Sequence, residues 1–114
     1  MKGISTHVLD TSIGRPAEGV MIKLERNTPG SGWTLVAESV TDTTGRVGQL
    51  LPPTEHLHLG GYRLRFDVET YFADQDRATF FPEVTIQFEV RDETQHYHVP
   101  LLLSPYGYST YRGS

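Results

Sequence analysis

This 114-residue sequence has no cysteine, no long apolar run and no excess of basic over acidic residues, and each of these absences is informative. Without cysteine there can be no disulfide, thiolate metal ligand or cysteine nucleophile, and a reducing compartment suits such a chain. No segment approaches the roughly 20 apolar residues of a membrane-spanning helix, and the N-terminus has no apolar run of signal-peptide length. Lys and Arg together number 10 against 14 Asp and Glu, which excludes a basic stripe for nucleic acid or anionic membranes. We therefore expect a cytoplasmic protein with neither kind of partner.

Length and composition predict one ordinary globular domain that spans residues 1–114. Hydrophobic residues make up 37% and charged residues 21% of the sequence, far from the composition of disordered chains. A chain of this length can bury one core but not two.

Period-two alternation of apolar and polar residues dominates the chain and indicates β-strands with one buried and one wetted face. It is clearest over residues 20–25, 62–68 and 84–90. Further strands are predicted at 4–10, 33–39, 47–50, 96–103 and 106–111, with Gly- and Pro-rich turns between them. One short, polar helix is expected on the surface around 69–76. About eight short strands with regular turns predict an all-β fold, a two-sheet antiparallel β-sandwich with one short helix.

The five histidines differ in position. His7 lies in the first predicted strand, opposite the Ile4 and Val8 face, where a half-buried structural histidine is the simplest interpretation. His96 and His98 share one face of a later strand, and a single exposed polar residue there would need no function. The remaining pair, at 56 and 58, lies beside Pro and Gly pairs and is expected to be non-catalytic.

Two His-x-His pairs raise the question of zinc, since residues two apart on a strand project to the same side. A catalytic zinc site needs a third protein ligand and an open position. Without cysteine, no motif identifies that ligand, so we expect no metal site.

The C-terminal segment is the least ordinary part of the chain. Tyr106 and Tyr108 suit a strand, but a closing strand gains little from the Arg-Gly-Ser that follows Tyr111. Chain ends are usually frayed and chemically bland. We therefore expect residues 111–114 to be docked on the protein and to take part in its function.

Three motifs resemble the 5-hydroxyisourate hydrolases, the enzymatic branch of the transthyretin-like family. They are Tyr-Arg-Gly-Ser at 111–114, Ser-Thr-His-Val-Leu-Asp at 5–10 and Thr-Asp-Thr-Thr-Gly-Arg-Val at 41–47. The third is the weakest, because its Asp-x-x-Gly-Arg is common in β-turns and occurs in non-catalytic sandwich domains such as carboxypeptidase regulatory-like modules. The hormone-carrying transthyretins lack the terminal motif.

The resemblance implies a transthyretin-like fold and hydrolytic opening of 5-hydroxyisourate to 2-oxo-4-hydroxy-4-carboxy-5-ureidoimidazoline in urate breakdown, without a cofactor. The matching positions are His7, Arg46, His98, Tyr111 and Ser114. Either histidine would suit proton abstraction from water, and a guanidinium matches a planar anion. Tyr111 would bind the ring, and Ser114 would add a hydrogen bond from its hydroxyl or terminal carboxylate. The resemblance further implies a homotetramer with active sites at a subunit interface.

Two alternatives remain at this point. A transthyretin-like module that binds an aromatic small molecule without catalysis would explain the sandwich and the tyrosines, but not His7, His98 and the terminal motif. A structural sandwich domain from a larger enzyme would not explain that motif either.

Overall fold

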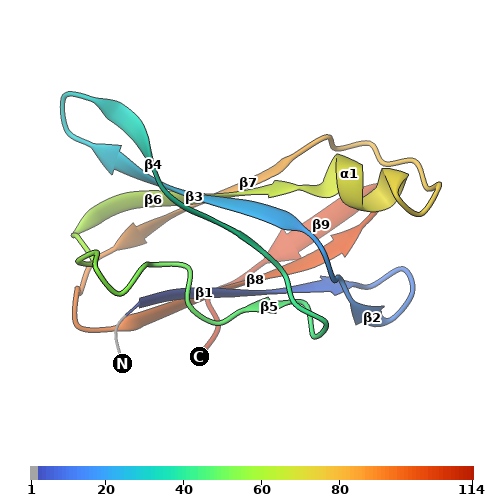
Figure 1. Ribbon diagram of the computed structural model, residues 1–114, viewed down its shortest axis with the longest axis horizontal. Coiled ribbons are helices and arrows are strands. Elements are labelled where there is room, and N and C mark those ends of the chain that lie inside the picture. Colours follow the sequence, from blue (N-terminus) through green and yellow to red (C-terminus); the bar gives the residue numbers. More distant parts are fainter. Residues whose placement is uncertain (1–2) are drawn as a thin grey trace.

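The structure is a computed structural model that describes residues 3–114. Its elements, labelled in Figure 1, are β1 (Gly3–Asp10), β2 (Arg15–Pro16), β3 (Met21–Thr28), β4 (Gly32–Val40), β5 (Arg46–Val47), β6 (Gly60–Asp67), α1 (Val68–Ala73), β7 (Val84–Val90), β8 (His96–Ser104) and β9 (Gly107–Thr110). Within these residues, no helix has the length and apolar character needed to cross a membrane.

The strands form two sheets that face each other as separate layers in Figure 1. One sheet has the order β4-β3-β6-β7, and every neighbouring pair in it is antiparallel. The other has the order β2-β1-β8-β9, with β5 paired to β1 beside β2. The predicted two-sheet sandwich with one short helix is confirmed.

The prediction of wholly antiparallel sheets is wrong at one place. β1 and β8 run parallel along their full length, from Gly3 opposite His96 to Asp10 opposite Leu103. The two strands are separated in sequence by the whole of the other sheet, so no hairpin forces them to run in opposite directions. Alternation reports which face of a strand is buried and carries no information about its direction.

Each predicted strand overlaps an observed one, and the differences lie at the edge of β1. The strand predicted at 47–50 is reduced to the two residues of β5, although Leu50 N still donates to Ile4 O at 2.8 Å. β2 was not predicted, because two residues cannot display a period. Since β8 occupies one edge of β1, these two short strands share the other.

The helix is shorter than predicted and lies on the surface with one face buried. α1 begins after Asp67, whose carboxylate accepts a hydrogen bond from Thr70 N at 3.2 Å. Val68, Tyr71 and Phe72 are buried. Their i, i+3, i+4 spacing places them on one face. Glu69, Thr70 and Ala73 are exposed, which agrees with the predicted surface position.

The core lies between the sheets and follows the predicted alternation. Fully buried side chains come from both layers, for example Ile4, Val8, Leu64, Phe66, Leu101 and Leu103. In β8 the predicted division is confirmed, since Tyr97, Val99, Leu101 and Leu103 join the core while His96 and His98 are half-buried.

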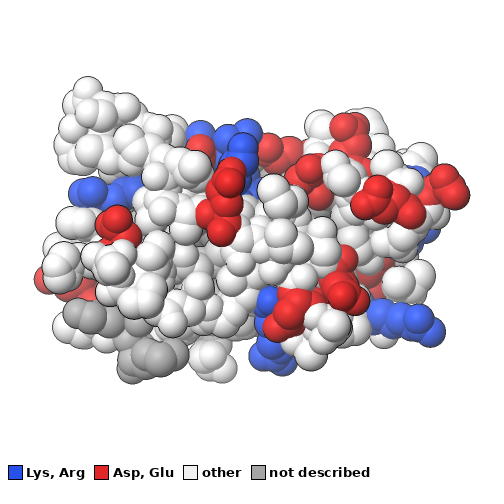
Figure 2. All heavy atoms as spheres, in the orientation of Figure 1, with Lys and Arg blue, Asp and Glu red and all other residues white. Residues whose placement is uncertain are grey.

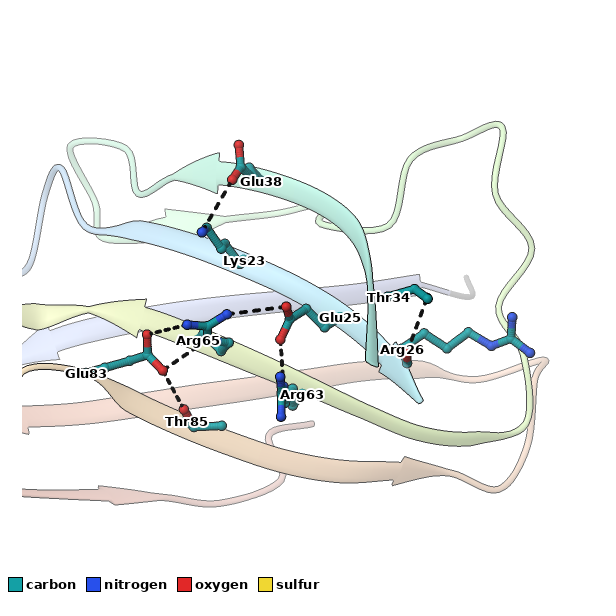
Figure 3. Close-up of polar contacts among 9 residues, drawn as sticks. All are labelled: Lys23, Glu25, Arg26, Thr34, Glu38, Arg63, Arg65, Glu83 and Thr85. Carbon is teal, nitrogen blue, oxygen red and sulfur yellow. Dashed lines mark hydrogen bonds and ion pairs between the residues drawn. The ribbon is translucent and has the colours of Figure 1, made fainter. Parts of the chain in front are cut away.

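The two outer faces are polar in different ways. On the four-stranded sheet, Glu25, Arg63, Arg65 and Glu83 are linked by ion pairs (Figure 3). In the view of Figure 2, acidic side chains gather at the end of the molecule that carries α1, and basic side chains are scattered. The outer face of the five-stranded sheet carries His7, His96, His98 and Arg46.

Candidate active site

Strand register brings the predicted catalytic side chains together on the outer face of the five-stranded sheet. His7 of β1 lies directly opposite Arg46 of β5, and directly opposite residues of paired strands share a face. On the other side of β1, Ser5 lies opposite His98 of β8. We call Ser5, His7, Arg46, His96 and His98 the outer-face cluster.

His98 is held by a hydroxyl on the neighbouring strand. Its Nδ1 lies 2.8 Å from Ser5 Oγ, and the same oxygen lies 2.7 Å from His96 Nε2. Burial lowers the pKa of His98, and its electrostatic interactions with His7, His96 and Arg46 lower it further. The imidazole is therefore held in its neutral form, which is the form that accepts a proton or donates a neutral hydrogen bond.

His7 is held by the backbone of the turn that precedes β5. Its Nε2 lies 2.9 Å from Thr44 O. A carbonyl oxygen can only accept, so this nitrogen carries the proton. When His7 is neutral, its lone pair is consequently on Nδ1.

The turn that positions Arg46 is organised by one carboxylate. Asp42 Oδ1 accepts hydrogen bonds from Thr44 N at 2.8 Å, Thr44 Oγ1 at 2.7 Å and Arg46 N at 3.0 Å. The bond from the Arg46 backbone and those from Thr44 lower the pKa of Asp42. Asp42 therefore stays ionised and fixes the turn around Arg46.

Gly45 is required in this turn for two reasons. Its φ of +77° lies in the left-handed region that favours glycine. A Cβ there would also collide with Val8 O, and Gly45 O accepts from Val8 N at 2.7 Å. The turn is thus packed directly against β1, which sets Arg46 beside His7.

The segment after β9 is docked along β8, next to His98. Gly113 forms an antiparallel bridge with His98, in the same register that pairs Thr110 with Leu101, and Gly113 N donates to His98 O at 2.8 Å. A Cβ on Gly113 would collide with His98 Cδ2. Arg112 lies over the Tyr97 ring at 4.5 Å and donates to Gln95 Oε1 at 2.8 Å.

A surface pocket joins most of these groups. Ser5, Arg46, His96, His98 and Ser114 are among its lining residues. The lining does not include His7, which adjoins it through Arg46, nor Tyr111. Tyr111 is 58% exposed and lines a neighbouring groove together with His98 and Phe88.

Sequence reasoning gave no role in the site to three residues that hold it: Ser5, Gly113 and Asp42, the last of which it assigned only to a β-turn. Ser5 could have been found, because it lies two residues before His7 in a predicted strand and so shares its face. The role of Gly113 depends on tail register, which no periodic signal reports. Across residues 3–114, no group of three or more His, Asp or Glu side chains is placed to hold a metal ion.

Comparison with known proteins decides the family. The HIUase/Transthyretin family matches residues 4–113 of the chain. The chain belongs to the HIUase/transthyretin family.

Within this family, the chain is 45% identical over 111 residues to the 5-hydroxyisourate hydrolase of Salmonella typhimurium, covering 97% of this chain and 80% of the relative. The solved structure of Klebsiella pneumoniae 5-hydroxyisourate hydrolase superposes with a TM-score of 0.85 at 37% identity, covering 100% of this chain and 94% of the other. Sea bream transthyretin in complex with thyroxine superposes with a TM-score of 0.89 at 32% identity, covering 96% and 93%. Since family members with different ligands share the fold, function must be argued from the site.

Proposed function

We propose that this protein is a 5-hydroxyisourate hydrolase of urate degradation. Its relatives of that name match nearly the whole chain. The structural observation that carries the proposal is the outer-face cluster, in which Arg46 and a neutral His98 line one pocket and His7 lies directly opposite Arg46. Such a site suits an electron-rich, planar substrate that must be attacked by water.

The reaction opens an acyl C–N bond in the ring. Water adds to the carbonyl carbon and loses a proton, the carbonyl oxygen becomes an oxyanion, and the C–N bond then breaks as the ring nitrogen takes a proton. The product is 2-oxo-4-hydroxy-4-carboxy-5-ureidoimidazoline. Two contributions are required of the protein: a base for the water and donors for the oxyanion.

We assign His7 and His98 jointly to activating water and moving its proton. Arg46 binds the substrate and donates to the oxyanion, and the turn fixed by Asp42 orients its backbone for this role. Tyr111 and Ser114 bind the substrate from the docked tail. Ser114 lines the same pocket as Arg46 and His98, which supports its assignment.

We propose a homotetramer whose subunit interfaces contain the active sites. Tyr111 is largely exposed in the single chain, and a second copy would bring a covering surface to it. Light scattering coupled to size exclusion would report the number of subunits.

A single domain over 1–114 is supported by the continuous core of the described residues. A cytoplasmic location stays a prediction that cell fractionation would test.

The reaction should need no metal or other cofactor. Exhaustive chelation is expected to leave the rate unchanged, because the residues assigned above supply both the base and the oxyanion donors. Loss of activity on chelation, with recovery on adding Zn²⁺, would contradict this assignment.

The decisive experiment is to generate 5-hydroxyisourate in place with urate oxidase and follow its ultraviolet absorbance. The protein is expected to accelerate the decay strongly over the spontaneous rate. Equal decay with and without protein would favour the second candidate, a binding module without catalysis. That candidate is supported by the thyroxine complex of sea bream transthyretin, and binding without turnover would identify it.

A further inference from the structure

The hydroxyl of Ser5 lies between two imidazoles. Its Oγ is 2.7 Å from His96 Nε2 and 2.8 Å from His98 Nδ1, and Ser5 is only 6% exposed. A serine hydroxyl has one proton to donate and can accept from other donors. It therefore cannot donate to both histidines, and the state of one ring constrains the state of the other.

The second ring nitrogen of His96 decides the direction of the two hydrogen bonds that join His96, Ser5 and His98. His96 Nδ1 is buried and has no hydrogen-bond partner within residues 3–114. A buried N–H without an acceptor is rarer and more costly than a buried acceptor without a donor. The proton of neutral His96 is therefore on Nε2, from which it is donated to Ser5 Oγ.

The hydroxyl proton of Ser5 then needs an acceptor other than His96. Among the described residues, the remaining partner in contact with Ser5 Oγ is His98 Nδ1. Donation to it completes a chain from His96 to Ser5 to His98. Neutral His98 consequently carries its proton on Nε2, the ring nitrogen that is not engaged with Ser5.

His7 has the complementary arrangement. Its Nε2–H donates to Thr44 O, which leaves the lone pair on Nδ1. Ser114, with its terminal carboxylate, lines the same pocket as His98. The groups that shift the pKa of His98 are His7 on β1, His96 on β8 and Arg46 on β5. All three disfavour a positive charge on His98, so the neutral donor form is the one that is populated.

We propose that Ser5 and His96 are positioning residues that hold neutral His98 as an Nε2–H donor to the oxyanion, and that His7 alone is the base. This inference rests on the proposed function and divides the role that was assigned jointly above. His7 Nδ1 takes the proton from water as the water oxygen bonds to the carbonyl carbon. It returns that proton to the ring nitrogen when the C–N bond breaks. His98 donates a hydrogen bond throughout and transfers no proton, a role that suits a neutral imidazole.

The test has a readout that does not depend on turnover. Long-range ¹H–¹⁵N correlation spectra of protein labelled with ¹⁵N-histidine distinguish the two imidazole tautomers. They are recorded without substrate, at alkaline pH where the rings are neutral. In the unsubstituted protein, His98 and His96 are both expected to be protonated on Nε2. In Ser5→Ala, His98 is expected to show a mixture of tautomers, and in Ser5→Thr the single tautomer should return.

Kinetics provide the second readout. Loss of one positioning hydrogen bond in Ser5→Ala should lower kcat roughly tenfold with little change in KM, and Ser5→Thr should recover most of it. His96→Gln, which retains an N–H near the position of Nε2, should be less impaired than His96→Leu. Ser109→Ala, on the exposed part of β9, is the matched control and should change neither readout.

The outcomes separate the two proposals. A proton on His98 Nδ1, or a Ser5→Ala spectrum identical to that of the unsubstituted protein, overturns the positioning inference even if the enzyme is active. The expected spectra in a protein that does not hydrolyse 5-hydroxyisourate would instead overturn the proposed function, while the hydrogen-bond chain would stand.

Discussion

The outer faces of the two sheets both carry charged side chains, but they hold them differently. On the four-stranded sheet, Glu25 pairs with Arg63 at 2.6 Å and Arg65 at 3.3 Å, and Arg65 also pairs with Glu83 at 3.0 Å (Figure 3). Burial alone would raise the pKa of Glu25, but the hydrogen bonds and charges of the two arginines lower it. Here each cation is matched to a carboxylate.

On the outer face of the five-stranded sheet, Arg46 is not paired with a carboxylate in this way. Within residues 3–114, the Arg46 guanidinium makes no ion pair, although its backbone is fixed by Asp42. Its neighbours His7 and His98 supply no negative charge, and the pocket that it lines with His98 also includes Ser114 at the end of the docked tail. A face that stabilises the fold satisfies its own charges, whereas a binding face keeps its backbone rigid and leaves the functional groups for a ligand.

The largest effect should come from removing a histidine of the outer-face cluster. His7→Ala and His98→Ala are each expected to lower kcat by about 10²-fold or more, the scale of a lost acid–base or oxyanion group. Both rings are partly exposed, so the fold should persist. Steady-state kinetics and circular dichroism measure the two properties. Near-normal turnover in either variant would exclude that histidine from the reaction.

Glu25→Gln, on the opposite face, is the matched control with the reverse pattern. Breaking an ion-pair network around a buried carboxylate with partly exposed partners is expected to reduce the free energy of unfolding by about 1–3 kcal/mol, with kcat unchanged. A variant that loses activity without losing stability would remove the contrast between the faces.

The next effect concerns the docked tail. Gly113→Ala adds a Cβ that collides with the His98 ring, so the tail or the imidazole must move. A displacement of about 1 Å in a catalytic group can cost up to about 10²-fold in rate, and we expect a kcat loss of at least tenfold. Few buried apolar contacts are lost, so the melting temperature should change little. Unchanged kinetics would show that the tail does not support the site.

Arg46→Lys should have a smaller effect because the charge is retained. Lysine cannot make the bidentate contact of a guanidinium, so one charge-assisted hydrogen bond to the substrate is lost. We expect kcat/KM to fall about tenfold. Arg63→Lys is the control on the other face and should leave kcat/KM unaltered. Equal kcat/KM in Arg46→Lys and the unsubstituted protein would reduce Arg46 to a turn residue.

The sequence predicted strand faces better than strand partners. Alternation correctly separated Tyr97 and Val99 from His96 and His98, because burial imposes a period on each strand. It could not reveal that β1 and β8 are parallel, which is the pairing that places Ser5 beside His98. A period-two pattern is the same for either direction and for any partner.

The candidate site shows the same limit at the level of single residues. His7, Arg46 and His98 were found through motifs, and the structure brings them to one face. Ser5 was quoted in a motif but given no role, because its importance depends on two histidines more than 90 positions away. Tyr111, which was predicted to bind the substrate, lines an adjoining groove together with His98. A tail has no packing period from which its docking could be read.

The smallest effect, and the one that isolates His98, is the dependence on pH. The folded-state pKa of His98 is lowered by burial and by the charges of His7, His96 and Arg46, whereas an unfolded chain keeps the ordinary value of about 6.5. Between that value and the lower folded pKa, His98 binds a proton in the unfolded state but not in the folded state. The contribution of His98 to the free energy of unfolding is therefore at its full value above about pH 6.5 and is lost as pH falls toward the folded pKa.

The melting temperature should follow the folded pKa of His98, so the loss of stability that this ring causes should extend below pH 6.5. Melting temperatures across the acid range measure this loss. His98→Gln cannot titrate, so its melting temperature should fall less over the same range. The ion-paired carboxylates Glu25 and Glu83 also have lowered pKa values, but their contribution is lost only at more acidic pH, near and below about 4.3. If His98→Gln and the unsubstituted protein lost stability equally between pH 7 and 5, His98 would be titrating as an ordinary exposed histidine. The contrast between the outer face of the four-stranded sheet, where arginines pair with carboxylates, and that of the five-stranded sheet would then not extend to the protonation of His98.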